Sequence, residues 1–151
     1  MFETGNILYF KPFLFKNGFE PKNKYFLILK KESDKVVLAS LPTSKDAVPN
    51  NVTKKLGCID DPKINFNCFY FPSGVDVATD FTTNKRFSFP RCTYVYGYRI
   101  DEFCIELFEK QLESNQTNIT LKGTLDKDIH RDLISCLKNS SSVKNKYKKI
   151  I

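Results

Sequence analysis

The chain has 151 residues, of which 41% are hydrophobic and 14% aromatic, so it can bury a core without disulfides or a metal and is not a disordered protein. No segment resembles a signal peptide and no apolar stretch reaches the length of a membrane helix, which predicts a cytoplasmic, single-domain protein with no membrane partner. The formal net charge of +7 favours an acidic partner.

Three apolar runs near the start of the chain predict buried strands. They cover residues 6–10, 25–29 and 36–41. Asn17-Gly18 and Pro21 mark a turn between the first two runs. Pro42 ends the third, because proline lacks the amide N–H that pairs with a neighbouring strand. Three strands this close in the sequence predict an antiparallel meander.

Aromatic segments in the middle of the chain predict further strands. Residues 45–63 are polar and punctuated by proline and glycine, which is typical of a long connection with one short strand at most. Phe and Tyr then gather in residues 66–71, 81–89 and 93–98. Several short strands at this spacing are typical of a small antiparallel β-barrel.

Two helices are expected in the last third of the chain. Residues 101–113 mix acidic and apolar positions and are interpreted as a helix. The second helix is expected to begin with Thr124 as its N-terminal cap and to end near Asn139. Its apolar residues recur every four positions, at Leu125, Ile129, Leu133 and Leu137. The fold class predicted is therefore mainly β with a C-terminal α-helix, within the α+β class.

Residues 140–151 are interpreted as a basic tail outside the domain 1–139. The serine run 140–142 is typical of a flexible joint, and the lysines of the tail have no acidic neighbours. Such a tail serves solubility in some proteins and nucleic-acid binding in others, so it does not decide the function.

The cysteine pattern predicts neither disulfides nor a metal site. Five cysteines occur at wide spacings without a Cys-x-x-Cys pair, and the chain has one histidine. We expect them to be reduced thiols that pack as small hydrophobic residues. The five are Cys58, Cys68, Cys92, Cys104 and Cys136.

Positive charge is concentrated in residues 11–55, which hold ten lysines and four acids, whereas residues 56–137 have more acids than bases. The lysines alternate with aromatic residues there, and phosphates pair with the former while bases stack on the latter. The alternative is that most of these aromatic side chains belong to the core, as large apolar groups usually do. The candidate RNA-binding residues are Lys11, Lys16, Lys22 and Tyr25.

Three segments, taken in order, resemble the MazF/PemK-like toxin superfamily. The first joins Gly5-Asn6-Ile7 to the basic Lys22-Asn23-Lys24 before the second strand, the second is Leu41-Pro42-Thr43-Ser44-Lys45, and the third is Gly123-Thr124-Leu125. The resemblance covers most of residues 5–137, although residues 57–100 contribute nothing to it. It implies an SH3-like barrel.

The ToxN-like branch is the most similar at the candidate site. Many members of the superfamily carry an arginine where this chain has Lys24, but that branch has a lysine there and a Thr-Ser pair followed closely by lysine, which resembles Thr43-Ser44-Lys45 at a slightly different spacing. The resemblance implies a toxin-antitoxin endoribonuclease that cuts single-stranded RNA without a metal or other cofactor. It also implies an antitoxin partner, protein or RNA, and is compatible with a homodimer.

The catalytic residues implied by the resemblance are Lys24, Thr43, Ser44 and Lys45. The reaction is attack of a ribose 2′-hydroxyl on the adjacent phosphate, with lysines stabilising the developing charge and hydroxyls orienting phosphate oxygens. His130 is expected at the surface of the last helix, which leaves the general acid and base unassigned.

Two alternatives to catalysis remain open from the residues themselves. Residues 43–46 also fit a capped turn after a strand, because Thr, Ser and Asp bond to their own backbone in such turns. The chain also fits a non-catalytic barrel that binds nucleic acid or a partner protein through its basic N-terminal face.

Overall fold

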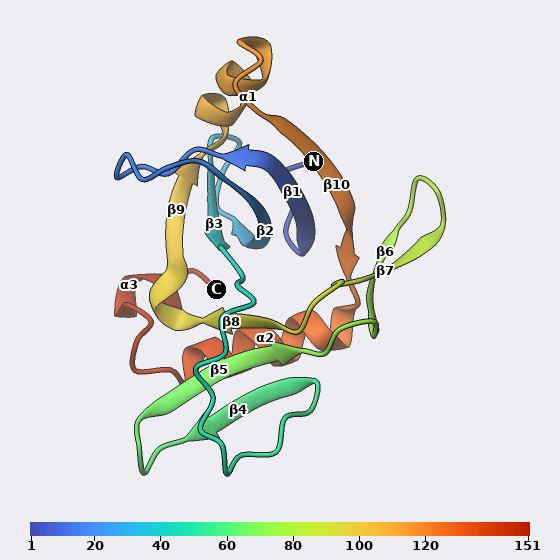
Figure 1. Cartoon of the computed structure of the whole chain (residues 1–151). Helices are drawn as coiled ribbons and strands as arrows, with labels where there is room; N and C mark the ends of the chain where they lie inside the picture. Colours follow the sequence, from blue (N-terminus) through green and yellow to red (C-terminus); the bar gives the residue numbers. More distant parts are fainter.

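A computed structural model describes residues 1–151 as two antiparallel sheets with three short α-helices (Figure 1). The larger sheet has the spatial order β7-β6-β10-β1-β2-β3-β9. Its strands are β1 Asn6–Phe13, β2 Lys22–Lys31, β3 Val36–Ser40, β6 Asp76–Asp80, β7 Lys85–Ser88, β9 Ile100–Cys104 and β10 Asn118–Leu125.

The smaller sheet has the order β4-β5-β8. Its strands are β4 Gly57–Asp61, β5 Phe66–Phe71 and β8 Thr93–Tyr96, and the helices are α1 Ile105–Glu113, α2 Lys127–Lys138 and α3 Asn145–Lys148. The sheets do not close into one barrel, but an isolated bridge pairs Thr43, just after β3, with Tyr94 of β8. None of the helices combines the length and the apolar character needed to cross a bilayer.

The predicted meander is confirmed, because β1, β2 and β3 are consecutive antiparallel neighbours. These strands are continuous apolar runs because both faces of the sheet are covered. Leu27 and Leu29 of β2 pack in a cluster of 17 buried residues that includes α2. Phe26 and Ile28 point the other way, into a cluster of 12 with α1. Side chains that alternate along one strand therefore pack into two separate hydrophobic cores.

The smaller sheet lies against α2, which runs beside β5 in Figure 1. Phe69 of β5 belongs to the core that contains α2, whereas Tyr70, Tyr94 and Tyr96 form a separate small cluster on the opposite face. Residues 45–63 hold one short strand, β4, as the sequence predicted.

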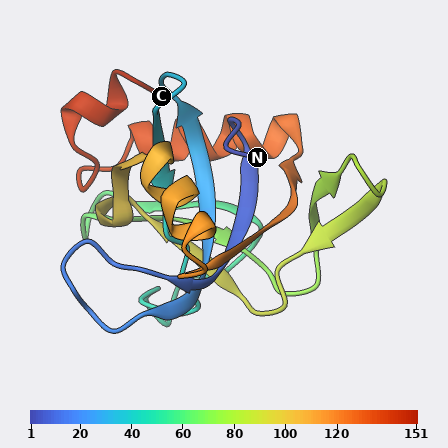
Figure 2. The same cartoon turned by 90° about the horizontal axis from the view of Figure 1, so that it is seen from above.

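The β6–β7 hairpin projects from the rest of the molecule (Figures 1 and 2). Its tip carries Phe81, which is 76% exposed. One residue pair away from its turn, the Arg86 guanidinium donates two hydrogen bonds to the Asp126 carboxylate, at 2.6 and 2.7 Å. This ion pair ties the hairpin to the start of α2 and holds the pKa of Asp126 below its usual value. The sequence predicted one strand over residues 81–89, but β7 is shorter and β6 precedes it.

Two predictions for the last third of the chain were partly wrong. Residues 101–113 contain the end of strand β9 before helix α1, because β9 completes the sheet beside β3. Thr124 does not cap a helix: it lies in β10, and its hydroxyl donates to Asn6 Oδ1 at 2.7 Å. Helix α2 begins at Lys127 with Asp126 as its N-cap, and its C-cap is Asn139, as expected.

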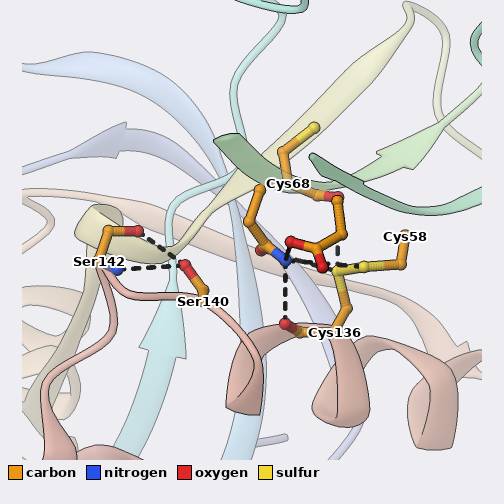
Figure 3. Close-up of a disulfide and its surroundings, with 7 residues drawn as sticks. Cys58, Cys68, Cys136, Ser140 and Ser142 are labelled. Atoms are coloured by element: carbon orange, nitrogen blue, oxygen red, sulfur yellow. Dashed lines mark hydrogen bonds between the residues drawn. A yellow bond between two sulfur atoms is a disulfide. The ribbon is translucent and has the colours of Figure 1, made fainter. Parts of the chain in front are cut away.

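The prediction of reduced cysteines was wrong for one pair. Cys58 of β4 and Cys136 of α2 form a disulfide across 78 residues of sequence (Figure 3). The spacing gave no indication of this pair, because β4 and α2 meet only in the folded chain. Cys68 is a buried thiol, as predicted, while Cys92 and Cys104 are exposed thiols.

Residues 140–151 pack on the domain, so the predicted flexible joint and solvated tail were wrong. Val143 and Tyr147 are buried in the same core as α2. The serines form a bonded turn, in which the Ser140 and Ser142 hydroxyls lie 2.8 Å apart (Figure 3). Gly97 permits this approach, since a Cβ on it would lie 2.7 Å from Val143 Cγ2.

Candidate functional site

A cleft of about 310 Å³ opens where the larger sheet meets the segment that leads into β8. Three parts of the chain line it: strands β1 and β2, the turn after β3, and residues 90–93. The lining residues are Tyr9, Asn23, Lys24, Tyr25, Pro42, Thr43, Ser44, Pro90, Arg91 and Thr93. The cleft thus brings together segments that are as far as 84 residues apart in sequence.

Backbone pairing positions two sides of the cleft. Tyr9 and Tyr25 are direct partners in the β1–β2 ladder, and their ring centroids are 4.8 Å apart. On the other side, Thr43 donates its amide to the Tyr94 carbonyl at 3.0 Å and accepts the Tyr94 amide at 2.8 Å. Thr43 is thereby held next to Thr93, whose hydroxyl donates to the Arg91 carbonyl at 2.7 Å. These backbone contacts make the cleft a preformed feature.

The charged groups of the cleft are all positive. Lys24 and Arg91 line it, no Asp or Glu does, and neither cation takes part in a salt bridge. Partial burial lowers the pKa of Lys24 from its ordinary value, and the positive charges of Arg99 and Lys22 lower it further. Two cations without a counter-ion create a site for an anion such as a phosphate.

The two tyrosines add hydrogen-bonding groups to the wall. Burial raises the pKa of the Tyr25 hydroxyl, and the neighbouring Tyr9 raises it further, so Tyr25 stays protonated at neutral pH. Lys122 of β10 places its Nζ 5.6 Å from the centroid of the Tyr9 ring. A protonated phenol is a donor and an acceptor, so it can bond to a ligand oxygen.

The turn after β3 presents hydroxyl groups to the same space. Thr43 Oγ1 accepts the Lys45 amide at 3.2 Å, and Asp46 Oδ1 accepts the Val48 amide at 2.8 Å. The predicted capped turn is therefore present. It does not use up the hydroxyl, because an oxygen that accepts one bond still has its proton to donate. Ser44 is exposed at the rim of the cleft.

The cleft gathers four of the eight predicted site residues. They are Lys24, Tyr25, Thr43 and Ser44. Lys45 does not line it; its carbonyl accepts the Tyr96 hydroxyl at 2.7 Å and its side chain is exposed. Lys22 lies just outside, near enough to affect Lys24.

Lys11 and Lys16 are further from the cleft. Lys11 is exposed and pairs with Asn118 across β1 and β10. Lys16 forms an ion pair with Asp101 at 3.0 Å, in another hollow of the surface. These two lysines do not belong to the site that contains Lys24.

Sequence reasoning missed Arg91, the second cation of the cleft. It stands in Pro90-Arg91-Cys92, a segment with no motif, and only the pairing of β8 with β5 and with Thr43 brings it to the cleft that Lys24 also lines. The planar guanidinium of an arginine can donate two parallel hydrogen bonds to a phosphate. Tyr9, Asn23 and Thr93 were also missed.

The sequence predicted that His130 lies free at the surface of the last helix, but its side chain is not free. It is half-buried, and its Nε2 lies 3.2 Å from the Leu29 carbonyl oxygen, away from the cleft residues. No group of three or more His, Cys, Asp or Glu side chains gathers where it could hold a metal ion.

Comparisons of the chain with protein-family models, with curated proteins and with solved structures found no match.

Proposed function

We propose that this protein is the toxin of a toxin-antitoxin system, an endoribonuclease that cuts single-stranded RNA in the Lys24–Arg91 cleft without a metal. The observation that carries the proposal is the make-up of that cleft: two unpaired cations, hydroxyls from Thr43 and Ser44, and no carboxylate. Such a set suits a phosphodiester better than a neutral or cationic substrate.

The chemistry requires charge stabilisation at one phosphate. The ribose 2′-oxygen forms a bond to phosphorus while the bond from phosphorus to the 5′-oxygen breaks, giving a 2′,3′-cyclic phosphate and a free 5′-hydroxyl. Lys24 and Arg91 stabilise the negative charge that grows on the non-bridging oxygens, and the Thr43 hydroxyl donates to one of them.

Two protons also move in this reaction. One leaves the 2′-hydroxyl and one reaches the 5′-oxygen, and general acid–base groups near neutral pKa do this best. Lys24, with its lowered pKa, is the lining group whose neutral form can accept the first, and on taking that proton it becomes the ammonium that stabilises the phosphate oxygens. The hydroxyls of Tyr9 and Tyr25 also line the cleft and are donors for the second.

In keeping with the resemblance of residues 5–137, we propose that the two sheets are the halves of an SH3-like barrel. The Thr43–Tyr94 bridge supports this interpretation because it links the end of β3 to the smaller sheet. The proposal includes a cytoplasmic location and an antitoxin, protein or RNA, that blocks the cleft.

The test is incubation of the purified chain with single-stranded RNA of mixed sequence in the presence of a chelator. We expect fragments that end in a cyclic phosphate, and about 100-fold slower cleavage by Lys24→Gln and by Arg91→Gln. Arg131→Gln is the matched control, since Arg131 is an exposed arginine of α2 outside the cleft. Intact RNA across many sequences, with no slowing of growth on expression, would overturn the proposal.

A non-catalytic role remains the second candidate, because Thr43 Oγ1 already serves the turn by accepting the Lys45 amide. In that case RNA binds in a salt-sensitive manner and is not cut, and Thr43→Val leaves the binding unchanged.

A further inference from the structure

A second hollow, of about 480 Å³, lies on the other side of the segment that follows β3. We call it the aromatic groove. Its walls come from the loop between β1 and β2, from residues 98–101 and from Lys144. The loop projects beside β9 in Figures 1 and 2. The proposed function does not use this groove.

Two exposed aromatic side chains face solvent in the groove. Phe19 is 69% exposed and Tyr98 is 63% exposed, which makes them two of the most exposed large hydrophobic residues of the chain. Tyr98 is also the outer member of a tyrosine stack, with its ring centroid 5.7 Å from that of Tyr96 and an interplanar angle of 16°. Exposed rings held in one hollow are typical of a binding surface.

The groove carries positive charge that nothing in the chain neutralises. Its one acid, Asp101, is already paired with Lys16 at 3.0 Å and accepts the Tyr147 hydroxyl at 2.9 Å. Arg99 and Lys144 have no carboxylate partner, and the Arg99 guanidinium lies 5.5 Å from the centroid of the Tyr98 ring. Rings and free cations thus occur side by side.

The groove and the cleft adjoin the same segment of the chain, the one that follows β3. Leu41 lines the groove and the next residue, Pro42, lines the cleft. The Leu41 amide bonds to the Arg99 carbonyl at 3.4 Å, and the charge of Arg99 reaches Lys24 strongly enough to lower its pKa. The two hollows therefore flank one segment, and Arg99 lies near enough to both for one extended strand to contact them.

We infer that the aromatic groove binds the unpaired nucleotides next to the scissile phosphate of a single-stranded RNA. Bases stack on Phe19 and Tyr98 while backbone phosphates meet Arg99 and Lys144. This combination of stacking platforms and cations is what unpaired strands require. A duplex fits poorly, because its base faces are already stacked on one another. The inference rests on the proposed function for the position of the cut.

The groove is tested with single-stranded oligonucleotides of about eight 2′-O-methyl nucleotides, which bind but cannot be cut because the attacking hydroxyl is blocked. We expect Phe19→Ala and Tyr98→Ala each to raise the Kd about tenfold in fluorescence anisotropy. Lys144→Gln should reduce the slope of log K against log salt by about 0.7, the share of one phosphate on a single strand. Phe81→Ala is the matched control, since Phe81 is as exposed but lies at the tip of the hairpin.

Cleavage kinetics separate this inference from the proposed function. A dinucleotide substrate is too short to reach the groove, so Phe19→Ala and Tyr98→Ala should cut it at the wild-type rate and should raise KM only for long RNA. If the protein cuts RNA while the variants bind long strands as tightly as wild type, the groove inference is overturned and the proposed function stands. Equal affinity for a duplex of the same sequence would also overturn it. If nothing is cut but the variants lose binding, the groove inference stands as a nucleic-acid site.

Discussion

Thr43 and Tyr94 exchange two backbone hydrogen bonds, of 3.0 and 2.8 Å, and so join the end of β3 to the smaller sheet. This pairing places the Thr43 hydroxyl opposite the segment that carries Arg91. It depends on the backbone alone, so the side chain of Thr43 can be changed without breaking it.

Thr43→Val is expected to slow RNA cleavage about 100-fold, because a donor to the charged phosphate oxygens is lost while the β-branched shape is kept. The free energy of unfolding should fall by about 1 kcal/mol at most, since only the hydroxyl bond to the Lys45 amide disappears. Single-turnover cleavage and urea unfolding measure the two effects. Thr53→Val, in an exposed position of the following loop, is the control. Equal rates for both variants would remove Thr43 from the mechanism.

Arg99→Gln is expected to raise the pKa of Lys24, because Arg99 is the stronger of the two neighbouring charges that lower it. The shift is measurable by NMR titration of the Lys24 side chain, with Arg131→Gln as the control that leaves it unchanged. Burial should keep the pKa below the ordinary value even in the variant.

The same lowered pKa predicts a pH dependence of stability. The folded protein binds the Lys24 proton less tightly than the unfolded chain does, so the charged group opposes folding at neutral pH. This unfavourable contribution is lost as the pH rises from the folded pKa towards the higher pKa of the unfolded chain. Lys24→Met should therefore raise the free energy of unfolding at pH 7, with a smaller gain at alkaline pH. A gain that grows with pH would contradict the assignment.

Opening the Cys58–Cys136 disulfide is expected to lower the free energy of unfolding by about 4.5 kcal/mol, from the chain entropy of a loop of 78 residues. Urea unfolding with and without a dithiol reductant measures this. Cys58→Ser should match the reduced protein and should no longer respond to the reductant. Cys104→Ser, which removes an exposed free thiol, is the control. An unchanged midpoint in reductant would show that the pair does not stabilise the fold.

Tyr147→Ala is expected to cost about 3 kcal/mol of unfolding free energy, because the ring is only 3% exposed and its removal leaves a cavity beside α2. Tyr147→Phe should cost about 1 kcal/mol, since it loses only the bond to Asp101 Oδ1. Lys149→Ala, in an exposed position of the same segment, is the control. Thermal unfolding of the three variants would show equal stability if residues 140–151 were a free tail.

Local sequence patterns were sufficient to predict strands that are buried on both faces along most of their length. The meander of β1, β2 and β3 could be predicted because an apolar run between turn residues leaves few alternatives. Strand β10 was missed although Asn118–Leu125 alternates polar and apolar residues, because this run stands just before helix signals and its pairing with β1 is set by a partner more than 100 positions earlier. Tyr147 was predicted to lie in a solvated tail, because the lysines around it outnumber this single buried aromatic residue.

By itself the sequence determined a mainly β chain with basic charge near its start. The grouping of Lys24, Thr43, Ser44 and Lys45 as one candidate site came from the family resemblance. Only the tertiary structure decided which other groups join them. Arg91 enters the cleft, Lys45 and Lys16 stay outside it, and Cys58 meets Cys136, because each of these relations depends on pairing between strands or helices far apart in sequence. Periodicity and composition act over a few residues, whereas such pairings are set by the packing of the whole chain.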